Sequence, residues 1–434
     1  MTTQENRQEL EALVTRFKYW LHVEDPTTIY TLCAVKLSHK IPGDPVWLML
    51  IGPSSDGKSE MLKAFTGDDE ITVDDLSEHT FVSGYRSKAT DEIPQFAELL
   101  ANRIWYIYDL SIMMSKPFEE RSTIFSDLRM IYDGRLKKRF GNKTDFDIPT
   151  PNNTLMCGST PVIDRTILED QLMGTRFMTW RTKTGNRKNI MNKIDQTEKD
   201  FVAMRGSLKT QVRSWENNIK IIDYQFTPED NVKLQNMANQ TTLLRTSVDV
   251  DRNRELANEA YPEAPGRFYR QLKKMYKAYR IMGLGEDEAM FCCKKLCWDC
   301  ILPTRLKVLE WLYNNNHNGG VHSLSQVSVG CQMGKGATKF QLSALMGLGI
   351  VRFEEKYDQT YRRDVEQWCI CDGGWEVLFK RPEQAKLNIV EQWTNVEPTD
   401  GKCAACGLEM VRIWRLGGDF YCQNCHEDYV TMDG

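Results

Sequence analysis

The segment with the clearest chemistry is Gly52-Pro53-Ser54-Ser55-Asp56-Gly57-Lys58-Ser59, which fits the pattern G-x-x-x-x-G-K-[ST]. In such a loop the glycines let backbone N–H groups curve around phosphate oxygens. The lysine neutralises the β- and γ-phosphates, and the hydroxyl completes the shell of a Mg²⁺ ion. The apolar run 46–51 before the loop predicts a buried strand, and a helical pattern follows the loop. We therefore expect residues 52–59 to bind ATP and Mg²⁺.

A second apolar run, residues 104–108, ends in Asp109, where a nucleotidase places the acid that holds Mg²⁺. The alternative for Asp109 is a helix N-cap without a metal role. Leu110 follows it, whereas many such enzymes have a glutamate there that activates water. The catalytic base is then expected elsewhere, with Glu78 as one candidate, or hydrolysis is expected to be slow.

A third apolar run, residues 154–158, ends in Ser159 and Thr160, which are predicted to reach the γ-phosphate or the attacking water. Strands that end in polar residues, with helical patterns between them, predict an α/β fold of three layers. Such a core is expected for residues 45–182, after an N-terminal helical segment at 1–44. Residues 183–302 are almost wholly helical in pattern and are expected to form a lid or linker.

The C-terminal third changes pattern at Pro303. Residues 303–381 predict a winged helix-turn-helix, with helices near 305–314, 323–329 and 337–348 and a hairpin at 350–363. Winged helices serve both DNA reading and protein docking, so this segment is expected to contact DNA or a replication protein.

Residues 397–434 contain two cysteine pairs, Cys403-x2-Cys406 and Cys422-x2-Cys425. Each pair can offer two thiolates, and together they predict a closed tetrahedral Zn²⁺ site in a zinc ribbon. The neighbouring His426 is interpreted as a bystander. Four further cysteines, at 292, 293, 297 and 300, leave two readings open, a buried helical stripe or a second metal site.

The bulk composition limits the classes of function. The chain has 434 residues, is 41% hydrophobic and carries a net charge of -4, so any contact with nucleic acid is expected to be local. No stretch approaches the roughly 18 to 20 apolar residues of a membrane span, and the N-terminus has no secretory pattern. We expect a protein of the host cytosol without membrane contact. Thirteen cysteines in uneven spacing speak against a disulfide framework.

Several motifs in a fixed order resemble the AAA+ ATPases of phages and mobile elements, distant relatives of the minichromosome-maintenance and superfamily 3 replicative helicases. The resemblance rests on residues 50–59, 109–111, 128–134, 158–161 and 174–177 and covers about residues 45 to 185, more weakly to 280. It implies a homo-hexameric ring that moves along single-stranded or forked DNA. Arg176, just before the apolar strand 177–180, is then the candidate arginine finger for a neighbouring subunit. A surface arginine is the alternative.

Two more clusters take roles from this resemblance. The related helicases have a hairpin that grips DNA in the channel, and the basic cluster with an aromatic residue that matches it is Arg135, Lys137, Lys138, Arg139 and Phe140. A solvated basic turn is the alternative. Arg267 and Arg270 begin an amphipathic helix that resembles the lid helix whose arginine contacts nucleotide, or they are surface arginines. The sequence thus favours a ring-forming helicase, and the rival is a non-translocating ATP-dependent switch or loader that recruits a replication or transcription partner.

Overall fold

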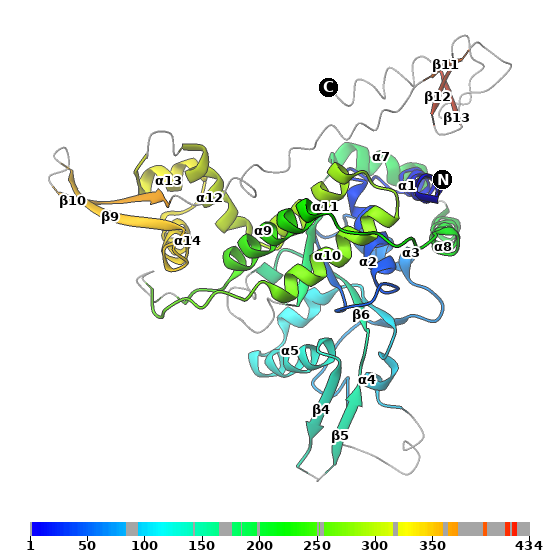
Figure 1. The fold of residues 1–434 in the computed structure, drawn as a ribbon, viewed down its shortest axis with the longest axis horizontal. Helices are drawn as coiled ribbons and strands as arrows, with labels where there is room; N and C mark the ends of the chain where they lie inside the picture. Colours follow the sequence, from blue (N-terminus) through cyan, green and yellow to red (C-terminus); the bar gives the residue numbers. More distant parts are fainter. Residues whose placement is uncertain are drawn as a thin grey trace. The chain divides into compact units, whose positions relative to one another are not determined.

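The computed structural model describes residues 2–83, 94–141, 144–164, 176–183, 185–197, 200–249, 251, 256–315, 320–358, 363–371, 394–396, 413–416 and 419–422. The chain divides into two compact units, Met1–Arg381 and Pro382–Gly434. The first unit contains the α/β fold that the sequence predicts (Figure 1). The predicted boundaries inside this unit stay predictions. Among the described helices, none combines the length and apolar character that crossing a membrane requires.

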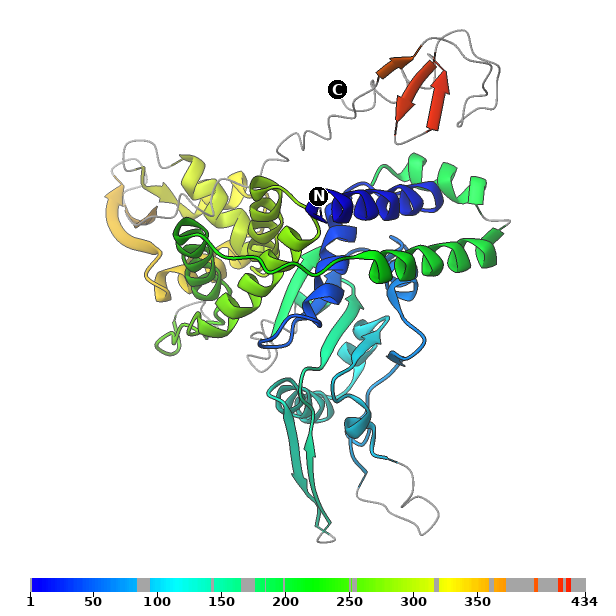
Figure 2. The same ribbon diagram turned by 45° about the vertical axis from the view of Figure 1, so that its right-hand side comes forward.

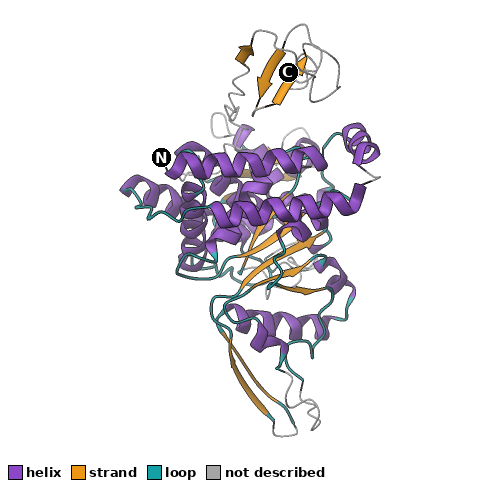
Figure 3. Cartoon of the chain, turned by 90° about the vertical axis from the view of Figure 1, so that its right-hand side faces the viewer, coloured by secondary structure: helices purple, strands orange, loops and turns teal. Residues whose placement is uncertain are grey.

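A parallel sheet of five strands forms the centre of the first unit, in the order β2-β3-β6-β1-β7. The strands are β1 (Trp47–Ile51), β2 (Ile71–Val73), β3 (Ile104–Ile107), β6 (Thr154–Ser159) and β7 (Phe177–Arg181). Every residue of β1, β3 and β6 is buried, because helices cover both faces of the sheet, as Figure 3 shows. The apolar runs at 46–51, 104–108 and 154–158 therefore predict β1, β3 and β6 correctly.

Alternate residues of β1 face opposite layers, as the two-residue period of a strand requires. Trp47, Met49 and Ile51 join a core with α4 (Phe96–Leu99), the 3₁₀ helix η1 (Leu110–Ser115) and α5 (Phe118–Tyr132). Leu48 and Leu50 join a larger core beneath α1 (Thr2–Trp20), α2 (Thr27–Ser38), α3 (Lys58–Phe65) and α8 (Phe201–Asn218). Because all five strands are parallel, their carboxyl ends meet at one edge of the sheet.

The described residues between 187 and 299 form five helices, as the predominantly helical pattern of the sequence predicts: α7 (Arg187–Thr197), α8, α9 (Pro228–Arg245), α10 (Gly266–Ile281) and α11 (Glu286–Asp299). Asp230 fixes the start of α9: its carboxylate accepts hydrogen bonds from the backbone N–H of Thr227 and the hydroxyls of Tyr224 and Tyr276. Such a capped start sets where the helix begins.

The end of α11 covers the outer edge of β7. The backbone N–H of Thr179 donates to Cys300 Sγ at 3.3 Å, and that of Arg181 donates to Asp299 Oδ2 at 2.8 Å. Lys295 Nζ lies 2.5 Å from the same Asp299 oxygen and balances its buried charge. Two N–H groups that this edge strand would otherwise expose are therefore bonded.

After Pro303 the order is helix, strand, helix, helix, strand, strand: α12 (Pro303–Asn315), β8 (His322–Ser323), α13 (Leu324–Gly330), α14 (Lys335–Gly347), β9 (Val351–Asp358) and β10 (Arg363–Ile370). Its three strands form an antiparallel sheet in the order β8-β10-β9. The sequence placed this hairpin at residues 350–363, which is too short. Its second strand starts at Arg363, because Val351 to Asp358 pair with Ile370 to Arg363.

A second antiparallel hairpin, β4 (Arg135–Arg139) with β5 (Asp145–Pro149), follows α5. Figures 1 and 2 both show it extending away from the helices. In the unit Pro382–Gly434 the described residues form β11 (Thr394–Val396), β12 (Ile413–Leu416) and β13 (Asp419–Cys422), an antiparallel sheet in that order.

Candidate functional site

The loop from Gly52 to Ser59 leaves the carboxyl end of β1 and enters α3, whose first residue is Lys58. Gly57 has φ +84°, a left-handed backbone that favours glycine, and Ser55 also has a positive φ of 65°. Neighbouring strands hold the start of the loop. The N–H of Gly52 donates to the carbonyl of Ser159 at 3.2 Å, and that of Thr182 donates to the carbonyl of Ile51 at 2.9 Å. A helix N-terminus directed at such a loop is a ready anion site.

Lys58 is buried within this loop, at 7% exposure. Its Nζ donates to the carbonyl oxygens of Gly52 at 2.9 Å and Pro53 at 2.5 Å, and to Asp56 Oδ1 at 2.7 Å. The ammonium is thus held inside the curve of the backbone, where a phosphate group would lie. Ser59, the next residue, lines the cavity described below.

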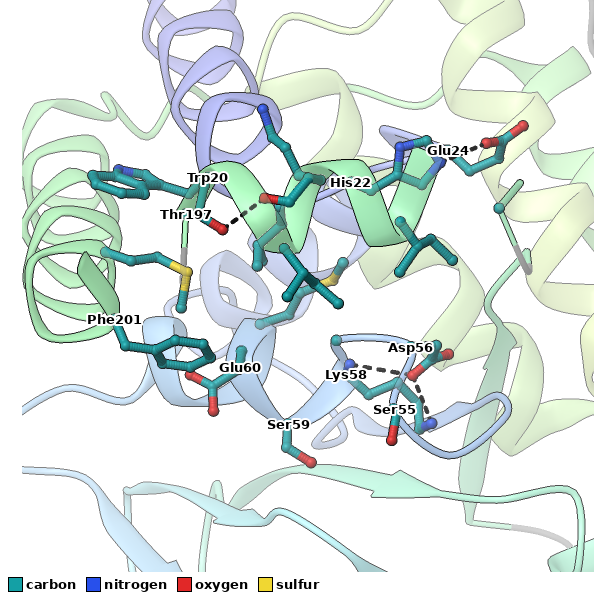
Figure 4. A pocket seen from close by; sticks show the side chains of 18 of the residues that line it. Trp20, His22, Glu24, Ser55, Asp56, Lys58, Ser59, Glu60, Thr197 and Phe201 are labelled. Atoms are coloured by element: carbon teal, nitrogen blue, oxygen red, sulfur yellow. Dashed lines mark hydrogen bonds and ion pairs between the residues drawn. The ribbon is translucent and has the colours of Figure 1, made fainter. Parts of the chain in front are cut away.

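A cavity of about 290 Å³ adjoins the phosphate loop. Residues 55–60 form its polar wall, and Trp20, Ile190, Ile194 and Phe201 contribute apolar surface from α1, α7 and the start of α8. Figure 4 shows Lys58, Asp56 and Ser55 gathered on one side and Trp20 and Phe201 on the other. A site with an anion-binding end and an apolar end fits a molecule made of phosphates and a flat base. The sequence did not identify these apolar residues, because helical spacing marks them only as buried positions.

Hydroxyl groups gather between the phosphate loop and Asp109. β6 lies between β1 and β3, so Ser159 and Thr160 lie between the loop and Asp109, which is about 10 Å from the loop across two strand spacings. Ser111 joins them: its Oγ lies 3.3 Å from Ser159 Oγ and 3.1 Å from Thr160 Oγ1, and it accepts from the N–H of Thr160 at 2.8 Å. The sequence placed three of these four side chains at one edge. Ser111 was missed as a site residue, although it stands only two residues after Asp109.

Asp109 caps η1, since its Oδ1 accepts from the N–H of Ser111 at 2.9 Å. Leu110 is fully buried in the core, so the position after Asp109 faces away from the hydroxyl cluster.

Two glutamates lie in the surrounding segments. Glu78, a candidate base, is half exposed and pairs with His79 at 3.3 Å. Glu60, one turn into α3, bonds the guanidinium of Arg205 on α8 at 2.7 Å, and this bond lowers the pKa of Glu60.

Arg176 stands just before β7, at the edge of the sheet opposite to the phosphate loop. The strand between them spans about 16 Å at 3.3 Å per residue, so Arg176 is remote from the loop of its own chain. Its Nη2 lies 2.8 Å from Asp133 Oδ2, and its guanidinium lies 5.9 Å from the centre of the Tyr132 ring.

The two arginines predicted on the lid helix lie at this same edge. The guanidinium of Arg267 lies 5.7 Å from the centre of the same Tyr132 ring, and Arg270 Nε donates to Asp44 Oδ2 at 2.7 Å. Asp44 precedes β1, which confirms the position at the amino edge. The structure therefore groups Arg267 and Arg270 with Arg176 rather than with the phosphate loop of the same chain.

Most cations of the β4–β5 hairpin have acidic partners. Arg135 pairs with Asp147, Arg139 lies 3.3 Å from Asp145, and Lys138 Nζ lies 2.7 Å from the buried Asp127. Lys137 is exposed and stands opposite Asp147 in the hairpin, where its charge helps to lower the pKa of that carboxyl, but no described residue forms a direct ion pair with it. The ring of Phe140 packs edge-on against Phe146 at 5.8 Å and receives Lys138 over its face, also at 5.8 Å.

Of the predicted zinc ligands, Cys422 ends β13, whereas Cys403, Cys406 and Cys425 lie outside the described residues. Burial raises the pKa of the thiols of the 292–300 group, Cys292, Cys293, Cys297 and Cys300. Across the part of the chain that the structure describes, no three His, Cys, Asp or Glu side chains are grouped to hold a metal ion.

Comparisons with known proteins give a distant likeness. No protein-family model matches the chain, and no curated protein does. Two solved structures of the NrS-1 C-terminal region, both A form and apo, align with 84% of this chain and 75% of theirs. Their sequence identities are 11% and 10%, with TM-scores of 0.28 and 0.26. Values this low support no statement about activity, so the function must be argued from the site itself.

Proposed function

We propose that the chain is a DNA-acting ATPase of the AAA+ type that works as a ring-forming helicase or translocase in DNA replication. The observation that carries the proposal is the phosphate loop at the carboxyl end of β1, opening into a cavity with an apolar far wall. The strand order adds to it, because β6 brings Ser159 and Thr160 between the loop and Asp109. These are the parts that phosphoryl transfer to water requires.

Each residue has a role that its position allows. Lys58 neutralises the β- and γ-phosphates, and the backbone N–H groups of residues 52–59 bind their oxygens. The Ser59 hydroxyl and the Asp109 carboxylate are hard oxygen ligands of the kind that Mg²⁺ prefers, and the ion would neutralise charge on the transferring phosphoryl group. The hydroxyls of Ser159 and Thr160 orient the attacking water or the γ-phosphate, and Ser111 holds both by hydrogen bonds.

Arg176 is proposed to act on the nucleotide of a neighbouring subunit. Because it lies at the opposite edge of the sheet from its own phosphate loop, one subunit presents the loop and the next presents the arginine. Arg267 shares the Tyr132 ring with Arg176 and therefore belongs to the same surface. This arrangement supports a closed ring, for which we propose six subunits.

DNA contact is proposed for the β4–β5 hairpin, which carries five basic and two acidic side chains between residues 135 and 149. Exposed cations bind phosphates and release counterions. The element order from α12 to β10 supports a winged helix, and the four cysteines at 403, 406, 422 and 425 support a Zn²⁺ ribbon as a second contact with DNA or a replication partner.

A non-translocating switch is the second candidate, and two observations favour it. The position after Asp109 is a buried leucine, and the ion pairs of Arg135, Lys138 and Arg139 reduce the charge that the hairpin offers to DNA. ATP turnover with and without single-stranded DNA, together with electron microscopy of the ATP-bound chain, separates the two. Lys58→Ala should abolish turnover in either case. A wild-type chain that turns over no ATP would refute the enzymatic assignment, and a monomer without DNA stimulation would refute the translocase.

A further inference from the structure

Asp56, inside the phosphate loop, is fixed at both of its carboxylate oxygens. Oδ1 lies 2.7 Å from Lys58 Nζ, and Oδ2 accepts a hydrogen bond from the Thr182 hydroxyl at 2.5 Å. The side chain is only 8% exposed. A Cβ added to Gly52 would overlap both the Thr182 hydroxyl and the Asp56 carboxylate. Gly52 is therefore required by this contact, in addition to any role in binding phosphate.

A carboxylate in this place opposes phosphate binding in two ways. Its negative charge repels phosphate oxygens at short range, where screening by solvent is weak. It also occupies Lys58, whose ammonium has three N–H donors and directs them to Gly52, Pro53 and Asp56. For a phosphate to be held by Lys58, at least one of these bonds must break.

The Asp56–Thr182 contact also ties the loop to the wall of the cavity. Thr182 directly follows β7 and precedes Lys183 and Gly185, which line the cavity together with α7. None of the residues of α7 is buried, so few packing contacts hold this helix in place. Thr182 stands three residues before Gly185 and five before Arg187, the first residue of α7.

We propose that Asp56 and Thr182 form a latch that weakens phosphate binding by the loop, and that breaking the latch frees the connection to α7. The latch rests on the proposed nucleotide-binding function. When nucleotide phosphates displace the Asp56 carboxylate from Lys58, they also break the latch with Thr182. Helix α7, the wall of the cavity that faces the base, then becomes looser. Binding at the phosphate end is coupled in this way to movement at the apolar end.

The test uses the full chain, isothermal titration calorimetry and two probes, MgATP and inorganic pyrophosphate. Asp56→Asn keeps the size and a hydrogen-bond acceptor but removes the charge, so it should bind both probes about tenfold more tightly, which corresponds to about 1.4 kcal/mol. Asp69→Asn is the matched control: it removes the same charge from an exposed position beyond the far end of α3 and should leave both affinities unchanged. Lys58→Ala should lose both.

Thr182→Val removes the hydroxyl of the latch and leaves the charge. Amide hydrogen exchange in residues 185–197 should become faster in this variant without nucleotide, while exchange in β1 stays slow. Unchanged exchange would refute the link to α7. If the wild-type chain binds MgATP but Asp56→Asn binds it equally or more weakly, the latch is refuted and the nucleotide-binding function is not. If the wild-type chain binds neither probe, the nucleotide-binding function itself is refuted, and the latch with it.

Discussion

Two adjacent lysines of the β4–β5 hairpin should respond to alanine substitution in opposite ways. Lys137 is exposed, and no described residue forms an ion pair with it, whereas Lys138 Nζ lies 2.7 Å from the buried carboxylate of Asp127. If the hairpin grips single-stranded DNA, Lys137→Ala should weaken DNA binding and leave the free energy of unfolding unchanged. Lys138→Ala should mainly destabilise the fold.

The magnitude for Lys137 follows from counterion release. Each lost phosphate contact lowers the slope of log affinity against log salt by about 0.7 for single strands, and by more when several subunits hold one strand. A fourfold rise in salt should then weaken the wild-type complex by at least about 2.6-fold more than the variant. Fluorescence anisotropy with a labelled oligonucleotide between 50 and 200 mM salt measures this slope. Lys233→Ala, which removes a partly exposed cation of α9 that pairs with Glu229 and Glu286, is the control.

The loss of unfolding free energy expected for Lys138→Ala follows from the Asp127 carboxylate, which the substitution leaves buried without its partner. Asp127 is 2% exposed, and losing one partner of a buried pair costs about 3 to 5 kcal/mol. Since the Lys138 side chain is 21% exposed, we expect about 2 kcal/mol, measured by urea unfolding. Burial raises the pKa of Asp127 and Lys138 lowers it, so the pKa rises further in the variant. The unfolding free energy lost in Lys138→Ala should therefore be largest at neutral pH. It should shrink as the pH falls towards about 4, because protonation removes the unpaired charge of Asp127. Equal salt slopes in wild type and Lys137→Ala would refute the hairpin as a DNA contact.

Three further outcomes are expected. Mixing inactive Lys58→Ala with inactive Arg176→Ala subunits should restore part of the ATP turnover, because each mixed interface can combine an intact loop with an intact arginine; no recovery at any ratio would exclude a finger in trans. Elemental analysis should give one zinc per chain, lost when any of the cysteines at 403, 406, 422 or 425 becomes serine, and two metals per chain would point instead to the 292–300 group. Arg305→Ala should lower the unfolding free energy by about 3 kcal/mol, because the buried guanidinium donates to the carbonyls of Leu244 and Thr246 at the end of α9; a loss below about 1 kcal/mol in urea unfolding would show that water replaces those bonds.

The sequence was informative wherever a local pattern determines a position. The uninterrupted apolar run 46–51, directly before the loop 52–59, predicts a strand buried on both faces, and β1 is that strand. Parallel strands share one edge for their carboxyl ends, so Asp109, Ser159 and Thr160 had to gather near the loop. These inferences needed only strand geometry and chain direction.

Packing between distant segments could not be predicted in the same way. Asp56 and Thr182 are 126 residues apart, and no local sequence pattern around either residue predicts their contact. The amphipathic spacing of α10 shows which of its faces is buried but not which edge of the sheet it approaches. The sequence therefore could not show that Arg267 and Arg270 lie with Arg176 at the amino edge of the sheet. Likewise, the apolar residues of α7 could not be read as a cavity wall.

The two margins of the central sheet offer little backbone for a further strand. At one margin β2 has only three residues, and at the other the N–H groups of Thr179 and Arg181 donate to a thiol and a carboxylate at the end of α11. A strand from a neighbouring subunit therefore finds little unpaired backbone at these two margins. In the proposed ring, we expect subunits to meet through side chains and loop ends rather than through a shared central sheet. Contacts between side chains and loops can break and re-form during each cycle of nucleotide turnover, whereas a continuous sheet would hold neighbouring subunits in one fixed arrangement.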